Sequence, residues 1–194
     1  MDTQNITFKL FAADGDAPPT HDVVRAFHRF IQEKVLDELL IDVADYGHVH
    51  RGPGVMLIAH EAHYGFEHGS DGRLGLKYAR KRGAPGSATA FAERLQLALR
   101  KAVAAARALE ADPGLSGKLR FRSDELRFSI EDRLHAPNDA GTLATVRDAL
   151  TPLLERAFGV APQLAHRDAP REPFAVDVRL PGAVTLEEAA RRLA

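Results

Sequence analysis

Three strand-like segments follow one another between residues 39 and 80 with no helical pattern between them, and this succession constrains the fold most strongly. Residues 39–43 and 55–66 are largely apolar, and residues 73–80 alternate apolar with small or polar side chains. Strands joined by short connections pair antiparallel, because parallel neighbours need a long crossover. We therefore expect a mostly antiparallel sheet.

The remaining segments divide into helical and strand-like patterns. Apolar residues recur at helical spacing in residues 21–35, from a capping Ser87 to about Glu110, from Asn138 or Thr142 to Gly159, and in residues 185–193. Alternating or extended patterns occupy residues 6–11, 118–132, 163–167 and 174–180. We interpret residues 118–132 as a hairpin around Ser123-Asp124.

This order of elements, β-α-β-β-β-α followed by β-β-α-β-β-α, predicts an α+β fold. We expect helices packed on one face of the sheet and two ferredoxin-like β-α-β-β-type halves, residues 1–112 and 113–194. No linker rich in Gly, Ser or Pro divides the chain, so residues 1–194 are expected to form a single compact unit.

Composition excludes several classes of protein. The chain has no cysteine, which excludes disulfides, thiolate metal sites and cysteine nucleophiles and fits a reducing cytoplasm. Its N-terminus lacks the basic and apolar regions of a signal peptide. No apolar run approaches the roughly 20 residues that cross a bilayer. We therefore expect a soluble, cytoplasmic protein without a membrane partner.

Charge is unevenly distributed along the chain. The net charge is −1, made up of −6 over residues 1–70, +6 over residues 71–134 and −1 over residues 135–194. The central excess either forms a weak anion-binding face or complements the acidic part across the fold or between subunits. Nucleic-acid binders usually carry a stronger basic bias, so nucleic acid is not an expected partner.

Histidine is concentrated in one segment. Five of the nine histidines are His48, His50, His60, His63 and His68. Imidazole is a common ligand of transition metals and titrates near neutral pH. His48, His50, His60 and His63 are therefore candidate ligands of a divalent transition metal, with the adjacent Glu61 as ligand or base. The alternative is that they are ordinary histidines, bonded to backbone carbonyls or solvated.

The pair His60-Glu61 interrupts an otherwise apolar segment, residues 55–66, and a buried polar pair must be hydrogen-bonded or is costly. The spacing of His60 and His63 is three rather than the four of a helical metalloprotease box. If residues 40–46 pair antiparallel with residues 55–64, His60 lies far from His48 unless the connection between the strands folds back.

Two further segments are candidates for ligand binding. The basic run Arg80-Lys81-Arg82 leads toward a helix N-terminus, where cations and the helix dipole attract anions, although it lacks the phosphate-binding P-loop pattern. A solvated charge run is the alternative. The turn Arg51-Gly-Pro-Gly54 has glycines that let a ligand approach the backbone, but tight turns use the same residues.

The chain resembles a family of uncharacterised bacterial proteins of similar length. The resemblance is carried by Leu40-Ile-Asp-Val-Ala-Asp-Tyr46 with His48, and by Gly52-Pro-Gly-Val-Met-Leu-Ile58 with His60-Glu-Ala62. The segments Phe27-His-Arg-Phe-Ile-Gln32 and Asp132-Arg-Leu-His-Ala-Pro-Asn138 extend it over most of the chain. It implies a complete unit and supplies no catalytic residue, cofactor or substrate.

Three functional hypotheses follow. The leading one is a homodimeric binding protein that holds a divalent metal or a small polar ligand at the His/Glu-rich strand and turn. The first alternative is a small-molecule enzyme in which a histidine–carboxylate pair performs general acid–base catalysis. The second is a structural or dimeric interaction module without a small-molecule site. Self-association is suggested by the alanine-rich face of the long central helix and by exposed strand edges.

Overall fold

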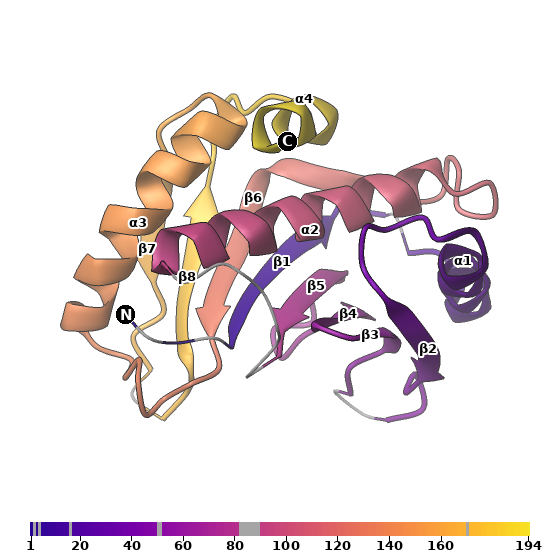
Figure 1. Cartoon of the computed structure of the whole chain (residues 1–194), viewed down its shortest axis with the longest axis horizontal. Coiled ribbons are helices and arrows are strands. Elements are labelled where there is room, and N and C mark those ends of the chain that lie inside the picture. The colour runs from indigo at the N-terminus through magenta and orange to yellow at the C-terminus, as the bar shows by residue number, and fades with distance from the viewer. Residues whose placement is uncertain (2, 4, 16, 50–51, 82–89, 170) are drawn as a thin grey trace.

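The computed structural model describes the chain except residues 2, 4, 16, 50–51, 82–89 and 170. It contains strands and helices in an order that alternates single helices with groups of strands (Figure 1). The elements are β1 (Ile6–Ala12), α1 (Thr20–Glu33), β2 (Leu40–Asp45), β3 (Val55–Ala59), β4 (Ala62–Glu67), β5 (Gly75–Arg80), α2 (Phe91–Ala111), β6 (Phe121–Ile130), α3 (Ala140–Phe158), β7 (Gln163–His166), β8 (Phe174–Arg179) and α4 (Leu186–Leu193).

The strands form one eight-stranded sheet in the order β2-β3-β4-β5-β1-β6-β8-β7. Every neighbouring pair is antiparallel, which confirms the predicted sheet and the α+β class. The strands before and after residue 112 occupy separate, contiguous parts of the sheet, and the pairing of β1 with β6 joins them. In the second part β8 lies between β6 and β7, an arrangement that is consistent with a split β-α-β unit.

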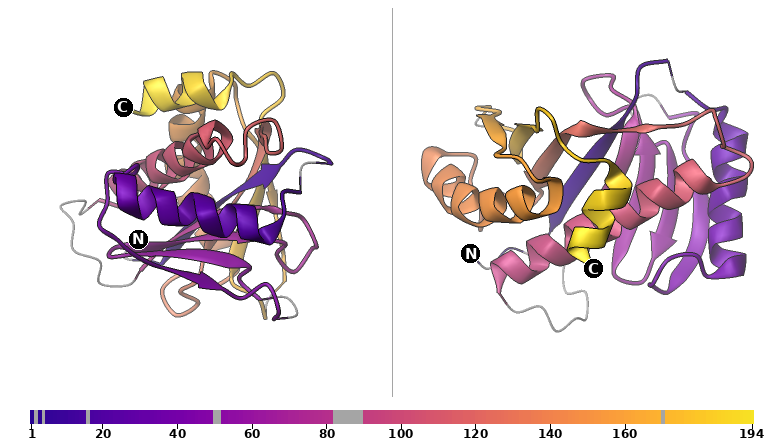
Figure 2. Two further views of the ribbon diagram at one scale, coloured as in Figure 1. Left: turned by 90° about the vertical axis from the view of Figure 1, so that its right-hand side faces the viewer. Right: turned by 90° about the horizontal axis from the view of Figure 1, so that it is seen from above.

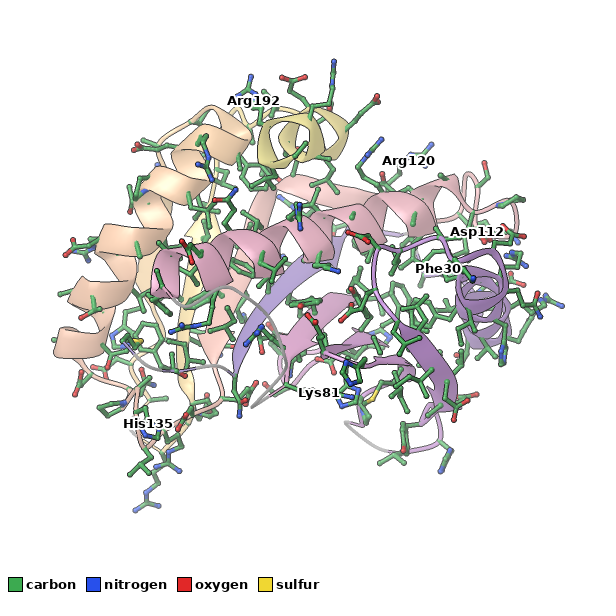
Figure 3. The ribbon with its side chains drawn as sticks, viewed as in Figure 1. Phe30, Lys81, Asp112, Arg120, His135 and Arg192 are labelled. Carbon is green, nitrogen blue, oxygen red and sulfur yellow. The ribbon has the colours of Figure 1, made fainter. Side chains whose placement is uncertain are left out.

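The helices lie on one face of the sheet, as predicted (Figure 2). Helix α2 crosses the central strands β1 and β5 and also contacts α3 and α4, whereas α1 covers β2 and β3. Alternate residues of β1, Ile6, Phe8 and Leu10, are fully buried in the core that the helices cover. A bidentate ion pair from Arg29 to Asp112 ties α1 to the end of α2 (Figure 3).

The segment Val55 to Phe66, predicted as one strand, is a hairpin instead. Strands β3 and β4 pair antiparallel with Ile58 opposite His63, so His60 and Glu61 occupy the turn between them. The two polar residues interrupt the apolar run because the chain reverses there. The turn lacks the Asn-Gly or Asp-Gly pair that signals a two-residue hairpin connection, which explains why the pattern did not reveal it.

The segment from Lys118 to Asp132, predicted as a hairpin, contains the single long strand β6. Its polar middle, Ser123-Asp124, lies where the register against β1 shifts rather than at a turn. Arg122 forms a bidentate ion pair with Asp124 at 3.0 and 2.8 Å. A bulge therefore accommodates these polar residues without reversing the chain.

Helix and edge predictions have mixed outcomes. The long central helix is described from Phe91 onward, and the predicted capping residue Ser87 lies outside the described residues. None of the described helices is long and apolar enough to cross a bilayer. Leu39, just before β2, and Ile41, within it, are exposed, but the Asp42 carboxylate already accepts the Val43 amide at 2.7 Å. Self-association through this edge remains a prediction.

We predict that Phe8→Ala lowers the free energy of unfolding by roughly 3–5 kcal/mol, because it leaves a cavity at the centre of the core. Phe8 is 0% exposed and its ring lies 5.1 Å from that of Phe128. Urea titration followed by circular dichroism measures the change. The control Leu134→Ala, at a side chain that is 83% exposed, is expected to cost under about 0.5 kcal/mol. Equal losses in the two variants would contradict the described core.

Candidate functional site

The face of the sheet that the helices leave uncovered carries a row of cations across its central strands. Lys9 of β1 lies directly opposite Lys77 of β5 on one side and opposite Arg127 of β6 on the other. Like charges directly opposite each other on neighbouring strands destabilise a sheet. The row is therefore costly unless the surroundings compensate it.

The cation row lies at the base of a polar cavity of about 410 Å³. The sheet supplies the floor, and two sets of loop residues supply the walls. The cavity is lined by Thr7, Lys9, Gly52, Pro53, Glu67, Gly69, Ser70, Lys77, Arg127, Ser129, Glu131, Arg167, Glu172, Pro173 and Ala175. A volume of this size suits a small molecule.

Lys9 is the buried cation of the row, with only 4% of its surface exposed. Its Nζ donates a hydrogen bond to the backbone carbonyl of Arg73 at 2.8 Å and lies 3.8 Å from the Glu67 carboxylate. Burial lowers the pKa of Lys9 to about 8, Glu67 and Asp71 oppose that shift, and Arg127 adds to it. A lysine in this setting carries its charge less readily than an exposed one.

Two arginines hold the loop between β4 and β5 against this face. The Arg73 guanidinium stacks on the Phe11 ring, 3.6 Å from its centroid. Arg127 bridges Asp177 at 2.6 Å and Asp71 of the loop at 2.9 Å. Because its Nε and Nη2 are each paired with a carboxylate, Arg127 is held in place and serves as a fixed wall of the cavity.

Thr7 lies beside Lys9 along β1, on the same face, and is 2% exposed. Within the part of the chain that the structure describes, its hydroxyl has no hydrogen-bond partner. Ser129 lies opposite Thr7 on β6 and also lines the cavity. A buried hydroxyl without a partner loses the bonds it would make to water, so a ligand atom that bonds to it would recover them.

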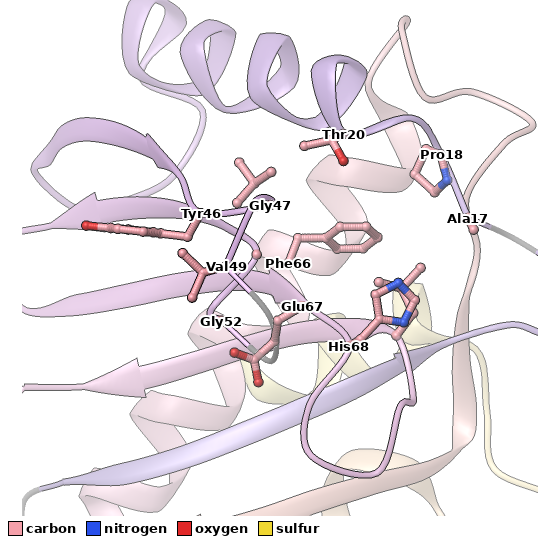
Figure 4. Close-up of a pocket in the computed structure, with 13 residues that line it drawn as sticks. Ala17, Pro18, Thr20, Tyr46, Gly47, Val49, Gly52, Phe66, Glu67 and His68 are labelled. Carbon is pink, nitrogen blue, oxygen red and sulfur yellow. The ribbon is translucent and has the colours of Figure 1, made fainter.

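A second cavity of about 390 Å³ adjoins the first and shares Gly52 and Glu67 with it. Figure 4 shows the Phe66 and Glu67 side chains leaving β4 in opposite directions near His68. A Cβ on Gly54 would lie 2.0 Å from the Phe66 carbonyl oxygen, and Gly54 has a φ of 64°. Glycine is thus required by close packing of the turn on β4. Arg51 lies outside the described residues.

The structure does not bring the candidate metal ligands His48 and His60 together. His48 is exposed in the connection between β2 and β3, and His60 is exposed at the opposite end of that pair of strands. The His60 amide donates to the Leu39 carbonyl at 2.8 Å, which agrees with the predicted register. His50, a further candidate ligand, lies outside the described residues.

Glu61, His63 and Lys81 are brought together where β4 pairs with β5. The Lys81 amide donates to the Glu61 carbonyl at 2.9 Å, and its Nζ donates to the Ala59 carbonyl at 2.6 Å. Burial, with help from Lys81, lowers the pKa of His63, whose Nδ1 has no partner among the described residues. Arg80 is buried, and Arg82 lies outside the described residues.

Metal-ligating side chains are not clustered in the described ranges: no group of three or more His, Asp and Glu residues there is placed to hold a metal ion. The structure instead contains a pair that the sequence reasoning missed. The His135 Nδ1 lies 3.0 Å from the Asp132 carboxylate, in the segment between β6 and α3, away from Lys81 (Figure 3). The spacing of three residues between Asp132 and His135 is the feature of the sequence that could have indicated this pair.

Comparison of the chain with protein-family models, with curated proteins and with solved structures found no match. The candidate site is therefore chosen from its own geometry. The cavity over the cation row combines a buried lysine, a buried hydroxyl that has no partner among the described residues and space for a ligand. The alternating pattern of residues 6–11 is consistent with Thr7 and Lys9 on the polar side of the strand, but no local pattern indicates that a distant loop buries them.

We predict that the stability of the protein rises with pH because of Lys9. Its pKa is about 8 when folded against 10.5 for an ordinary lysine, so the unfolded state binds more protons between these values. From pH 7 to pH 9.5 the contribution is about 2 kcal/mol. Urea titrations across this range should show the increase in the wild type and lose it in Lys9→Met. A parallel pH dependence in both proteins would contradict the assignment.

Proposed function

We propose that the protein binds a small, singly charged carboxylate in the cavity over the cation row. The observation that carries the proposal is the Thr7 hydroxyl, buried at the floor without a partner in the described chain. Beside it, the Lys9 ammonium donates one hydrogen bond to the described residues and has two further donors by its chemistry. A carboxylate has two oxygens that accept bonds from such donors.

The charges around the cavity favour a single negative charge on the ligand. Among the described lining residues, Arg127 pairs with Asp71 and Asp177, Arg167 pairs with Asp177, and Lys77 pairs with Glu131. Lys9 is the lining cation with donors left for a ligand, and its single charge matches a monoanion. A dianion would face unpaired negative charge from the wall residues, so we place phosphate second.

This proposal keeps the small polar ligand expected from the sequence and moves its site. The Gly52-Pro53 turn still forms part of the wall, whereas the exposed His48 and His60 lie outside the lining. The enzyme alternative retains one pair, His135 with Asp132, which lines neither cavity. We also propose a cytoplasmic setting, because the chain contains no cysteine.

We predict that Thr7→Val weakens the binding of acetate and pyruvate by roughly 3- to 10-fold, because one hydrogen bond to the ligand is lost. The same change is expected to leave the stability of the unliganded protein unchanged or higher, since it removes a buried hydroxyl without a partner. Titration followed by backbone amide chemical shifts measures the affinity, and urea unfolding measures the stability.

Thr145→Val is the matched control, because it makes the same change on the exposed surface of α3. It should alter neither carboxylate affinity nor the chemical shifts of the cavity residues. Inorganic phosphate tests a ligand with more negative charge and should bind more weakly than acetate. If carboxylates do not perturb residues of the cavity, or if Thr7→Val binds them as well as the wild type, the proposal is wrong.

A further inference from the structure

The arrangement around Lys9 has a second chemical consequence. Lys9 is buried between two cations, with Lys77 opposite it on β5 and Arg127 opposite it on β6. Removal from water and neighbouring positive charge both favour the neutral amine over the ammonium. A neutral amine is a nucleophile, whereas an ammonium is not. Burial is thus the main feature that activates Lys9 for attack on a carbonyl carbon, and the two cations add to it against the carboxylates of Glu67 and Asp71.

The protonation equilibrium agrees with this geometry. With a pKa of about 8 rather than 10.5, the neutral amine of Lys9 is roughly 300 times more populated at neutral pH than that of an exposed lysine. The groups that face it include Glu67 and Asp71, which favour the charge, and Arg127 and Lys77, which disfavour it. The Lys9 Nζ donates a hydrogen bond to the Arg73 carbonyl.

A proton acceptor and a carboxylate-binding group lie within reach of this amine. The Glu67 Oε1 lies 3.8 Å from the Lys9 Nζ and lines the same cavity. Lys77 and Thr7 are neighbours of Lys9 on the cavity floor. By strand geometry their Cα atoms lie about 5 and 7 Å from that of Lys9. A ligand whose carbonyl is adjacent to its carboxylate spans such a short separation.

We propose that Lys9 forms a reversible imine with a 2-oxo carboxylic acid held in the cavity, an inference that rests on the proposed carboxylate binding. Glu67 takes a proton from the Lys9 ammonium, and the amine attacks the ketone carbon. The C–N bond forms as the carbonyl electron pair moves to oxygen, and a proton passes from nitrogen to that oxygen. Glu67 then returns its proton to the hydroxyl, which leaves as water as the C=N bond forms.

The experiment traps this imine in the full-length protein. Pyruvate and sodium cyanoborohydride together are expected to add to one lysine the mass of pyruvic acid less one oxygen atom. A peptide map should place the adduct on Lys9 in at least about tenfold excess over the exposed Lys34 and Lys118, since its neutral amine is roughly 300 times more populated than that of an ordinary lysine. Labelling of Lys9 should rise with pH, because only the neutral amine attacks the ketone. Lactate, which has the carboxylate but no ketone, should compete without being trapped.

The controls separate this inference from carboxylate binding. Lys9→Arg removes the primary amine and is expected to lose the adduct. Because the wild-type map contains Lys34 and Lys118 as internal references, the result does not depend on the folding of this variant. Binding of pyruvate with no adduct on Lys9, or labelling spread evenly over exposed lysines, overturns the imine and leaves carboxylate binding intact. Absence of pyruvate binding overturns both proposals.

Discussion

The antiparallel pairing of β1 with β6 is the interaction on which the rest of the structure depends. It joins the two groups of strands into one sheet and places Phe8 against Phe128 beneath the helices. Since successive residues of a strand point to opposite faces, the same register places Lys9 opposite Arg127 on the uncovered face. The core and the candidate site are therefore two sides of one pairing, and a shift of one residue would destroy both.

Two neighbouring cations on the uncovered face, Arg127 and Lys9, differ in how the protein compensates their charge. Arg127 is bridged by Asp71 and Asp177, so its charge is compensated within the protein. Within the described part of the chain, Lys9 has one carbonyl acceptor at hydrogen-bond distance, and the Glu67 carboxylate lies 3.8 Å away. Residues that break the local rules of protein stability often belong to functional sites. This contrast between two neighbouring cations is the physical basis for placing the ligand at Lys9.

The sheet could be predicted because it follows from local sequence patterns. The site could not, because it depends on contacts between residues far apart in the sequence. Short connections among the strands of residues 39–80 dictate antiparallel neighbours, and the alternation around Phe8 reveals β1. The polar pair His60-Glu61 was correctly recognised as an anomaly, but a turn explains it, and the turn lacks glycine and asparagine. Burial of Lys9 depends on a loop more than 60 residues away, as its bond to the Arg73 carbonyl shows. No local pattern encodes that contact.

The most direct test is the pKa of Lys9 itself, measured by NMR from the ε-carbon shift of the labelled lysine with and without saturating acetate. In the free protein the account predicts a pKa near 8. A carboxylate bound beside the ammonium favours its charge, so acetate is expected to raise that pKa toward the ordinary lysine value while exposed lysines stay unchanged. A Lys9 that titrates like the exposed lysines, or one whose pKa acetate leaves unmoved, would contradict the central claim.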